Sequence, residues 1–188
     1  GGAAADPAAV DAGAGMVSGV TEPEVRMGEP MVIDDVEVTL LAARVGPVEV
    51  MDLLGKQYFT PDPFLTLELS LHNLSTAEVV LAQTWHDSRL LDERGRRLPR
   101  AFADNARLEA PVGALDEEAV KPGATVTDRV VFAWAETDAA SMTFVSDPGF
   151  RRLLPSGASR QISLARFRLS FDRAEVQVAA DSPAAPAP

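Results

Sequence analysis

The stretch from Leu65 to Asn73 alternates strictly between apolar and polar side chains, in the order Leu-Thr-Leu-Glu-Leu-Ser-Leu-His-Asn. A period of two is typical of a β-strand with one face in a core and the other face in water. The turn-prone segment Asn73-Leu-Ser75 ends the run, and a second apolar strand begins at Val79. These features predict an antiparallel all-β domain.

Comparable patterns recur along the chain. Further strands are predicted at 36–40, 48–50, 78–82, 126–134, 142–144 and 165–171. A hairpin is predicted over 89–98 with its turn at Gly95, and a turn at Lys121–Ala124. Residues 103–120 are predicted to form a long polar connection, and no amphipathic helix of three turns is indicated. About eight or nine short strands with long loops favour a β-sandwich.

The two ends of the chain differ in composition from its middle. Residues 1–21 are rich in Ala and Gly, and residues 174–188 are rich in Pro and Ala, so both are predicted to be linkers. The sandwich is predicted to occupy residues 22–173. A folded module between two linkers is typical of one part of a longer or tethered protein.

Composition narrows the classes of function. No run approaches the roughly 18 consecutive apolar residues of a membrane-spanning helix. The net charge of −11 disfavours nucleic acid, because an acidic surface repels the phosphate backbone. The absence of cysteine excludes disulfides, thiolate metal sites and cysteine nucleophiles.

The order of the features resembles that of a known family. A strand ending in His72-Asn73 precedes a strand ending at Trp85, and these are followed by the hairpin Leu91–Arg96, a turn at Pro122-Gly123 and the strand Val126–Phe132. Over roughly residues 28 to 171 this order resembles bacterial immunoglobulin-like domains of uncharacterised function, the DUF4352-type domain, found in lipoproteins and membrane-tethered extracytoplasmic proteins. The resemblance implies an immunoglobulin-like antiparallel β-sandwich. Leu98 stands where the family more often has an aromatic residue, so no ligand role of the hairpin turn is carried over.

Candidate catalytic groups are sparse. His72 and His86 are the only histidines, and neither an HxH nor an HExxH spacing is present. The chain also lacks the Gly-x-Ser-x-Gly nucleophile elbow. We therefore expect no enzymatic activity and no cofactor, with both histidines in exposed or structural roles.

Acidic residues in the loops are candidates for calcium binding. Hard carboxylate oxygens that converge at one end of a sandwich suit this ion. The candidates are Asp92, Glu93, Asp116, Glu117 and Glu118. The alternative is that acidic loops simply solvate an acidic protein.

The hairpin over 89–98 carries a basic cluster in an otherwise acidic chain. Its candidate residues for interaction with an anionic partner are Arg94, Arg96, Arg97 and Arg100. The alternative is that these arginines pair with Asp92, Glu93 and Asp104.

The two tryptophans offer a further alternative, a platform for stacking sugars. Trp134 shares a strand face with Val130 and Phe132, so it is predicted to lie in the core. Trp85 is predicted to be more open, at the end of a strand.

Together these observations predict a non-catalytic, extracytoplasmic accessory or protein-interaction domain of a membrane-anchored bacterial protein. The expected partner is an unknown protein or cell-envelope component, contacted through the long 103–120 connection. Nucleic acid is not expected, and membrane contact is expected only through an anchor outside this chain. The expected location is the periplasm or cell surface. The alternative is a calcium- or carbohydrate-binding β-sandwich module.

Overall fold

The computed structural model describes residues 22–82, 85, 87–102, 109–115, 117–134, 138–146, 149–153, 159–163 and 166–179. Within these residues the only helical element is the short 3-10 helix η1 (Arg173–Glu175), and the remaining elements are strands.

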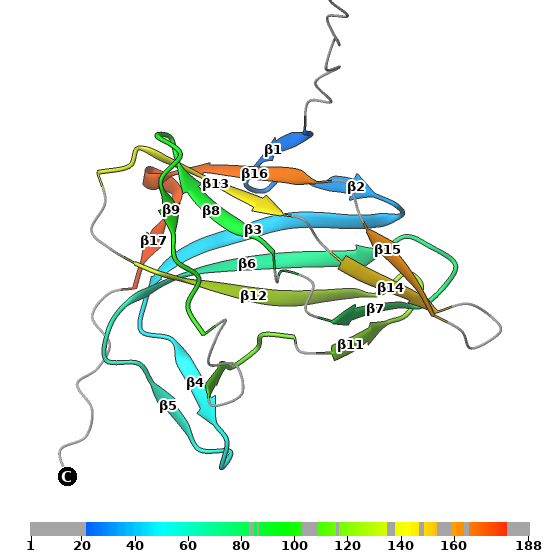
Figure 1. The fold of residues 1–188 in the computed structure, drawn as a ribbon, viewed down its shortest axis with the longest axis horizontal. Helices are drawn as coiled ribbons and strands as arrows, with labels where there is room; N and C mark the ends of the chain where they lie inside the picture. The colour runs from blue at the N-terminus through cyan, green and yellow to red at the C-terminus, as the bar shows by residue number, and fades with distance from the viewer. Residues whose placement is uncertain are drawn as a thin grey trace, which may run out of the picture.

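Two five-stranded arrays form the two layers of a sandwich (Figure 1). The first sheet has the order β1 (Glu24–Arg26), β16 (Phe167–Asp172), β13 (Ser141–Ser146), β8 (Arg89–Asp92) and β9 (Arg97–Leu98). The second has the order β12 (Thr125–Ala133), β6 (Phe64–Asn73), β3 (Val36–Gly46) and β17 (Gln177–Val178), with β2 (Met31–Ile33) also paired to β3. Two facing sheets around one core are the architecture of immunoglobulin-like sandwiches, so the predicted fold class is confirmed.

Two smaller sheets extend this sandwich. One has the order β11 (Glu117–Val120), β7 (Val79–Ala82), β14 (Gly149–Leu153) and β15 (Ser159–Ser163). The other has the order β10 (Glu109–Pro111), β4 (Glu49–Asp52) and β5 (Gln57–Phe59). Seventeen strand segments lie within the described residues, so the predicted count of eight or nine was too low. The strands that were not predicted are mostly short or pair with segments distant in sequence. Three residues are too few to show an alternating pattern, and the pattern does not reveal distant partners.

The prediction that residues 103–120 form one continuous loop was wrong. Residues 109–111 form β10, which pairs with β4, and residues 117–120 form β11, which pairs with β7. Residues 103–108 and 116 lie outside the described part of the chain. A deletion of 103–120 would therefore remove two paired strands as well as a surface segment.

The leucines of β6 form the centre of the core. Leu65, Leu67, Leu69 and Leu71 are all essentially inaccessible to solvent, as the alternation predicts. The opposite sheet contributes Phe144 and the alternating residues Phe167, Leu169 and Phe171 of β16 to the same cluster.

A β-bulge changes the face of β3. Leu40 pairs with Leu69 and Ala42 with Glu68, so Leu41 is the extra residue and is exposed. Even-numbered residues face the core before the bulge, whereas Ala43 and Val45 face it afterwards.

The folded domain continues past the predicted boundary at residue 173. β17 pairs in parallel with β3, and the Ala179 amide donates to the carbonyl of Val45. β1 also pairs in parallel, with β16, so the sandwich is not wholly antiparallel.

Candidate interaction site

Two hairpins of the sandwich close through the same five-residue turn. In the β8–β9 hairpin, the Asp92 carboxylate accepts hydrogen bonds from the amides of Arg94 (2.9 Å) and Arg96 (2.7 Å) through Oδ1. The Asp92 amide donates to the carbonyl of Arg96, and the Gly95 amide donates to the carbonyl of Asp92. Gly95 has a φ of 76°, a left-handed conformation that suits glycine. This hairpin and the position of Gly95 in it were predicted.

The β4–β5 hairpin repeats this geometry. Oδ1 of Asp52 accepts hydrogen bonds from the amides of Leu54 and Lys56, both at 2.9 Å. The Asp52 amide donates to the carbonyl of Lys56, the Gly55 amide donates to the carbonyl of Asp52, and Gly55 has a φ of 78°. This turn was not predicted, although Asp-x-x-Gly followed by a basic residue occurs at both places.

The two turns differ in the side chains that they expose. The positions after the aspartate hold Leu53 and Leu54 in one turn and Glu93 and Arg94 in the other. All four side chains are exposed; Leu54 is 93% and Leu53 70% accessible. We call Leu53 and Leu54 the apolar tip. Because the second turn has the same backbone bonds with charged residues, the fold does not require leucine at either position.

The base of the β4–β5 hairpin is held firmly. Val48 and Val50 pack with Val131 on the outer face of β12 in a small second core. Thr60 donates its amide to the Val48 carbonyl and accepts the Val48 amide through Oγ1. Partly buried side chains, including Tyr58, pack against this second core.

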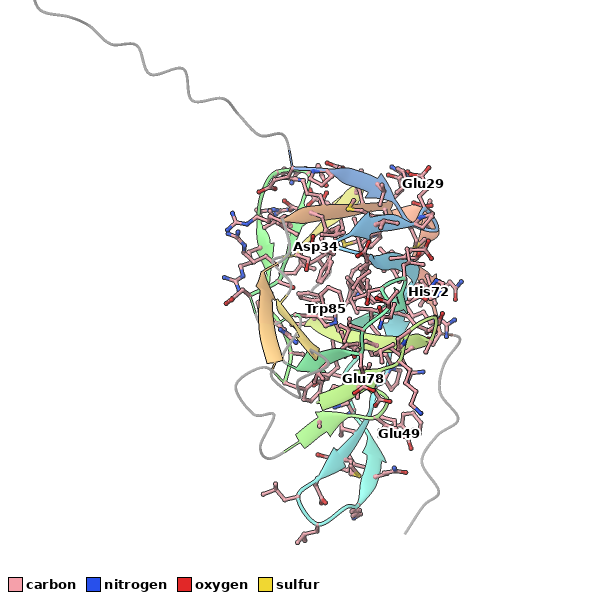
Figure 2. The ribbon with its side chains drawn as sticks, turned by 90° about the vertical axis from the view of Figure 1, so that its right-hand side faces the viewer. Glu29, Asp34, Glu49, His72, Glu78 and Trp85 are labelled. Carbon is pink, nitrogen blue, oxygen red and sulfur yellow. The ribbon has the colours of Figure 1, made fainter. Side chains whose placement is uncertain are left out.

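The tip, by contrast, projects from the body. Figure 1 shows the hairpin extending from one end of the sandwich, with β1 at the opposite end. Figure 2 shows the same projection from the side, with Glu49 toward the body. Met51 and Phe59 lie on neighbouring strands of the hairpin and are also exposed. The hairpin therefore presents apolar side chains on a rigid, protruding element.

The charged hairpin tip is neutralised by pairs within the chain. Arg94 and Arg96 both bind Asp138, at 2.8 and 2.9 Å, and Arg96 Nε also binds Asp92 Oδ2 at 2.5 Å. Hydrogen bonds from Arg96 and Arg94 lower the pKa of Asp138 to about 2. Burial alone would raise the pKa of Asp92, but hydrogen bonds from Arg96 and Arg94 lower it overall. The predicted pairing with Asp92 is confirmed; Asp138 is a partner that the sequence did not indicate, and Asp104 lies outside the described residues.

The other two candidate arginines have different surroundings. Arg97 is exposed on β9. Arg100 is partly buried and donates from a guanidinium nitrogen to the backbone carbonyl of Trp85. Burial lowers the pKa of Arg100, and the charge of Asp128 opposes that shift. The four arginines therefore do not form one free basic surface.

Asp128 is a buried polar group that was not among the predicted site residues. It faces the core on β12 with Val130 and Phe132. Its Oδ2 accepts the indole N–H of Trp85 at 2.6 Å, and its Oδ1 accepts the amides of Leu115 (2.8 Å) and Arg129 (2.7 Å). Burial raises the pKa of Asp128, and these hydrogen bonds oppose the shift. We call Asp128 and these donors the Asp128 cluster; its geometry is that of a structural link between segments.

The structure corrects the expected exposure of Trp85. Only 3% of this residue is accessible, and its ring packs against Phe144 at 5.8 Å between centroids. Trp134 is the more open tryptophan and lies under the guanidinium of Arg173 at 5.6 Å. It is only partly buried, packing against the edge of the core. The two tryptophans therefore do not share one exposed surface.

The remaining candidates occupy separate places. His72 lies on the outer face of β6 with Nδ1 at 3.7 Å from Glu37 Oε1, as expected for a solvent-facing strand position. His86 and Asp116 lie outside the described residues. Oε2 of Glu93 accepts the amide of Ala140 at 3.1 Å. Glu118 is exposed on β11, whose strand also contains Glu117, in a different sheet from Asp92.

Within the described residues, neither a metal-binding cluster nor a membrane-spanning helix occurs. No three imidazole or carboxylate groups among them lie close enough together to hold a metal ion. None of the helical structure that they form is long and apolar enough to cross a lipid bilayer.

The comparisons with known proteins concern the fold. No family model matches the chain, and no curated protein matches it. Among solved structures, the yjhA protein from Bacillus subtilis is similar with 12% identity and a TM-score of 0.48, over 73% of this chain and 97% of that one. An uncharacterised β-sandwich protein from Clostridium difficile 630 is similar with 10% identity and a TM-score of 0.39, over 80% of this chain and 95% of that one. The assignment of this chain to the β-sandwich class rests on its own strand pairing and core.

Proposed function

We propose that this chain is a non-catalytic accessory domain of a membrane-anchored bacterial protein, displayed outside the cytoplasm and acting by surface recognition. The order of sequence features, which resembles DUF4352-type domains of lipoproteins, supports the location. The observation that carries surface recognition is the apolar tip. A rigid hairpin exposes two leucines at positions where an equivalent turn in the same domain has charged residues.

Exposed apolar side chains are unfavourable in water unless a partner covers them. Scattered single apolar residues on a surface need no explanation, but grouped ones mark interaction sites. Leu53 and Leu54 are adjacent, and Met51 and Phe59 follow on the same hairpin. The sandwich thus serves as the rigid support, and the β4–β5 hairpin is the recognition element.

The location is tested by expressing the complete gene in its own host and fractionating the cells. We expect the protein in the membrane fraction, released by detergent but not by high salt, and digested by protease added to spheroplasts. Recovery in the soluble cytoplasmic fraction, protected from that protease, would overturn the proposed location.

A further inference from the structure

We propose that the apolar tip inserts into the surface of a lipid bilayer, giving the domain a direct membrane contact in addition to its anchor. This inference rests on the proposed function, because the contact is effective only in a tethered protein. It names a partner for the hairpin that the sequence resemblance does not supply.

Three backbone amides of the turn already have hydrogen-bond partners within the protein. A polar backbone group that enters hydrocarbon must be satisfied within the protein. In this turn, the amides of Leu54 and Lys56 donate to the Asp52 carboxylate, and the Gly55 amide donates to the Asp52 carbonyl. The leucines can therefore enter a lipid surface while these amides keep their partners.

The side chains favour lipid over a protein pocket. Residues that dominate protein–protein contacts are enriched in Trp, Tyr and Arg, whereas Leu is under-represented. The apex here is purely aliphatic. A projecting tip also meets a flat surface without a complementary cavity on the partner, and both views show the hairpin projecting beyond the body (Figures 1 and 2).

The negative charge of the protein determines which kind of lipid surface the tip can contact. Lys56 is exposed beside the leucines, whereas the Asp52 carboxylate is engaged in the turn. Acidic residues lie at the hairpin: Glu49 begins β4, and Glu109 of β10 pairs in register with Asp52, next to the leucines. Because the whole chain carries −11, we assign the contact to a lipid surface of low net charge.

A second copy of the chain is a less suitable occupant. A stable interface buries about 800 Å² on each partner, far more than a pair of leucines supplies. Two chains of net charge −11 also repel each other.

The contact is weak by itself. Two leucine side chains contain less hydrocarbon than a myristoyl group, which alone gives only marginal membrane binding. A tether raises the effective concentration of the tip at the surface, so that a weak contact becomes populated. β1 lies at the end opposite the hairpin, and the 21 residues before Glu22 span roughly 70 Å when fully extended. An upstream anchor would therefore hold the start of the domain within this distance of the bilayer.

The test uses the full chain with an N-terminal hexahistidine tag, bound to phosphatidylcholine vesicles that contain a nickel-chelating lipid. The chain has no cysteine, so Gln57→Cys gives one labelling site for a polarity-sensitive NBD fluorophore beside the leucines. The matched control is Arg97→Cys, the equivalent exposed position of the charged turn. We expect a blue shift and quenching by doxyl-labelled lipids for the label at 57 and neither change for the label at 97.

The deciding variant is Leu53→Glu with Leu54→Arg in the Gln57→Cys background, which gives this turn the residues of its equivalent. We expect complete loss of the blue shift and of the quenching, with an unchanged urea midpoint of unfolding. If the label at 57 shows no shift on tethered protein that keeps Leu53 and Leu54, the proposal is overturned. Equal responses at 57 and 97 would also overturn it, because they indicate non-specific adsorption.

Self-association provides the remaining outcome. A dimer mass by light scattering that the double substitution abolishes, with no response to vesicles, would replace lipid by a second copy and overturn the proposal. Because the tag supplies the tether in this assay, a negative result would overturn only the proposed lipid contact of the tip. The proposed location is decided separately by cell fractionation.

Discussion

Asp128 shows how one buried side chain can connect segments that are distant in sequence. Its carboxylate joins β12 to Trp85, which follows β7, and to Leu115, which precedes β11. Trp85 in turn packs on Phe144 of the opposite sheet and receives Arg100 on its carbonyl. A buried carboxylate is costly unless its oxygens are satisfied, and here both oxygens accept hydrogen bonds.

Asp128→Asn should lower the free energy of unfolding by about 2 kcal/mol. The substituted amide can retain one acceptor oxygen, but its NH₂ group then faces the indole N–H of Trp85, and two donors cannot pair. Urea unfolding followed by circular dichroism measures the loss. Trp85→Phe should cost less in the Asp128→Asn background than in the unsubstituted chain; a coupling below about 0.5 kcal/mol would contradict a direct bond.

Asp138 should titrate well below its ordinary value. Its pKa is lowered from 3.8 to about 2 by hydrogen bonds from Arg96 and Arg94. Because the folded-state pKa lies below that of the unfolded chain, these pairs stabilise the fold above about pH 4, and their contribution is lost as the pH falls toward 2.

Carboxyl chemical shifts followed by NMR between pH 1 and 6 measure this titration directly. Asp138→Asn is the control, and its stability difference from the unsubstituted protein should shrink as the pH falls through this window. A midpoint for Asp138 near 3.8 would show that the arginines do not bind it in solution.

At the scale of elements, the two equivalent turns separate what the fold needs from what it tolerates. Both need aspartate to accept two amides and glycine to adopt a positive φ. The two residues between the aspartate and the glycine are not fixed by the turn. They are apolar in the β4–β5 turn and charged in the β8–β9 turn. The proposed recognition role of the apolar tip rests on the difference at these two positions.

Gly55→Ala and Gly95→Ala should each lower the free energy of unfolding by about 1 kcal/mol. A Cβ at either glycine meets no atom within 4 Å, so the cost comes from the positive φ alone and should be similar at both sites. Urea midpoints of the two variants measure it. Asn tolerates the left-handed region, so Gly55→Asn and Gly95→Asn should cost less. A clear loss at only one turn would contradict their equivalence.

At the scale of the whole molecule, the C-terminal segment completes the sandwich. β17 adds to the edge of β3, and Val176 packs against the main core. Arg26 near the start of the domain binds both Asp172 (2.7 Å) and Glu175 (2.9 Å), so the two ends of the described chain are joined.

A chain ending at residue 179 should keep the stability of the full chain, whereas a chain ending at 173 should lose roughly 1–2 kcal/mol, as expected for the loss of a few backbone hydrogen bonds. Urea unfolding of both chains measures the difference in their free energies of unfolding. Gly46→Ala is a matched probe, because its Cβ would lie 2.8 Å from Cβ of Ala179. This substitution should destabilise the longer chain more than the shorter one; equal effects would show that β17 is not docked in solution.

The sequence by itself determined the features that depend on neighbouring residues. Alternation identified the core face of β6 and β16, and Gly95 located the β8–β9 turn, because strand faces and tight turns are set within a few residues. The same local rule identified the turn at Lys121–Ala124, where the Ala124 amide donates to the Lys121 carbonyl.

Only the tertiary structure decided which side chains are buried by other segments and which are exposed to solvent. Asp128 occupies a strand position that reads as ordinary alternation, yet the segments packed over it bury it. Leu53 and Leu54 have the composition of core residues, yet their hairpin projects beyond the body and exposes them. Burial and ion pairing depend on which distant segments meet, as Arg94 and Asp138 do, and no local pattern in the chain records that choice.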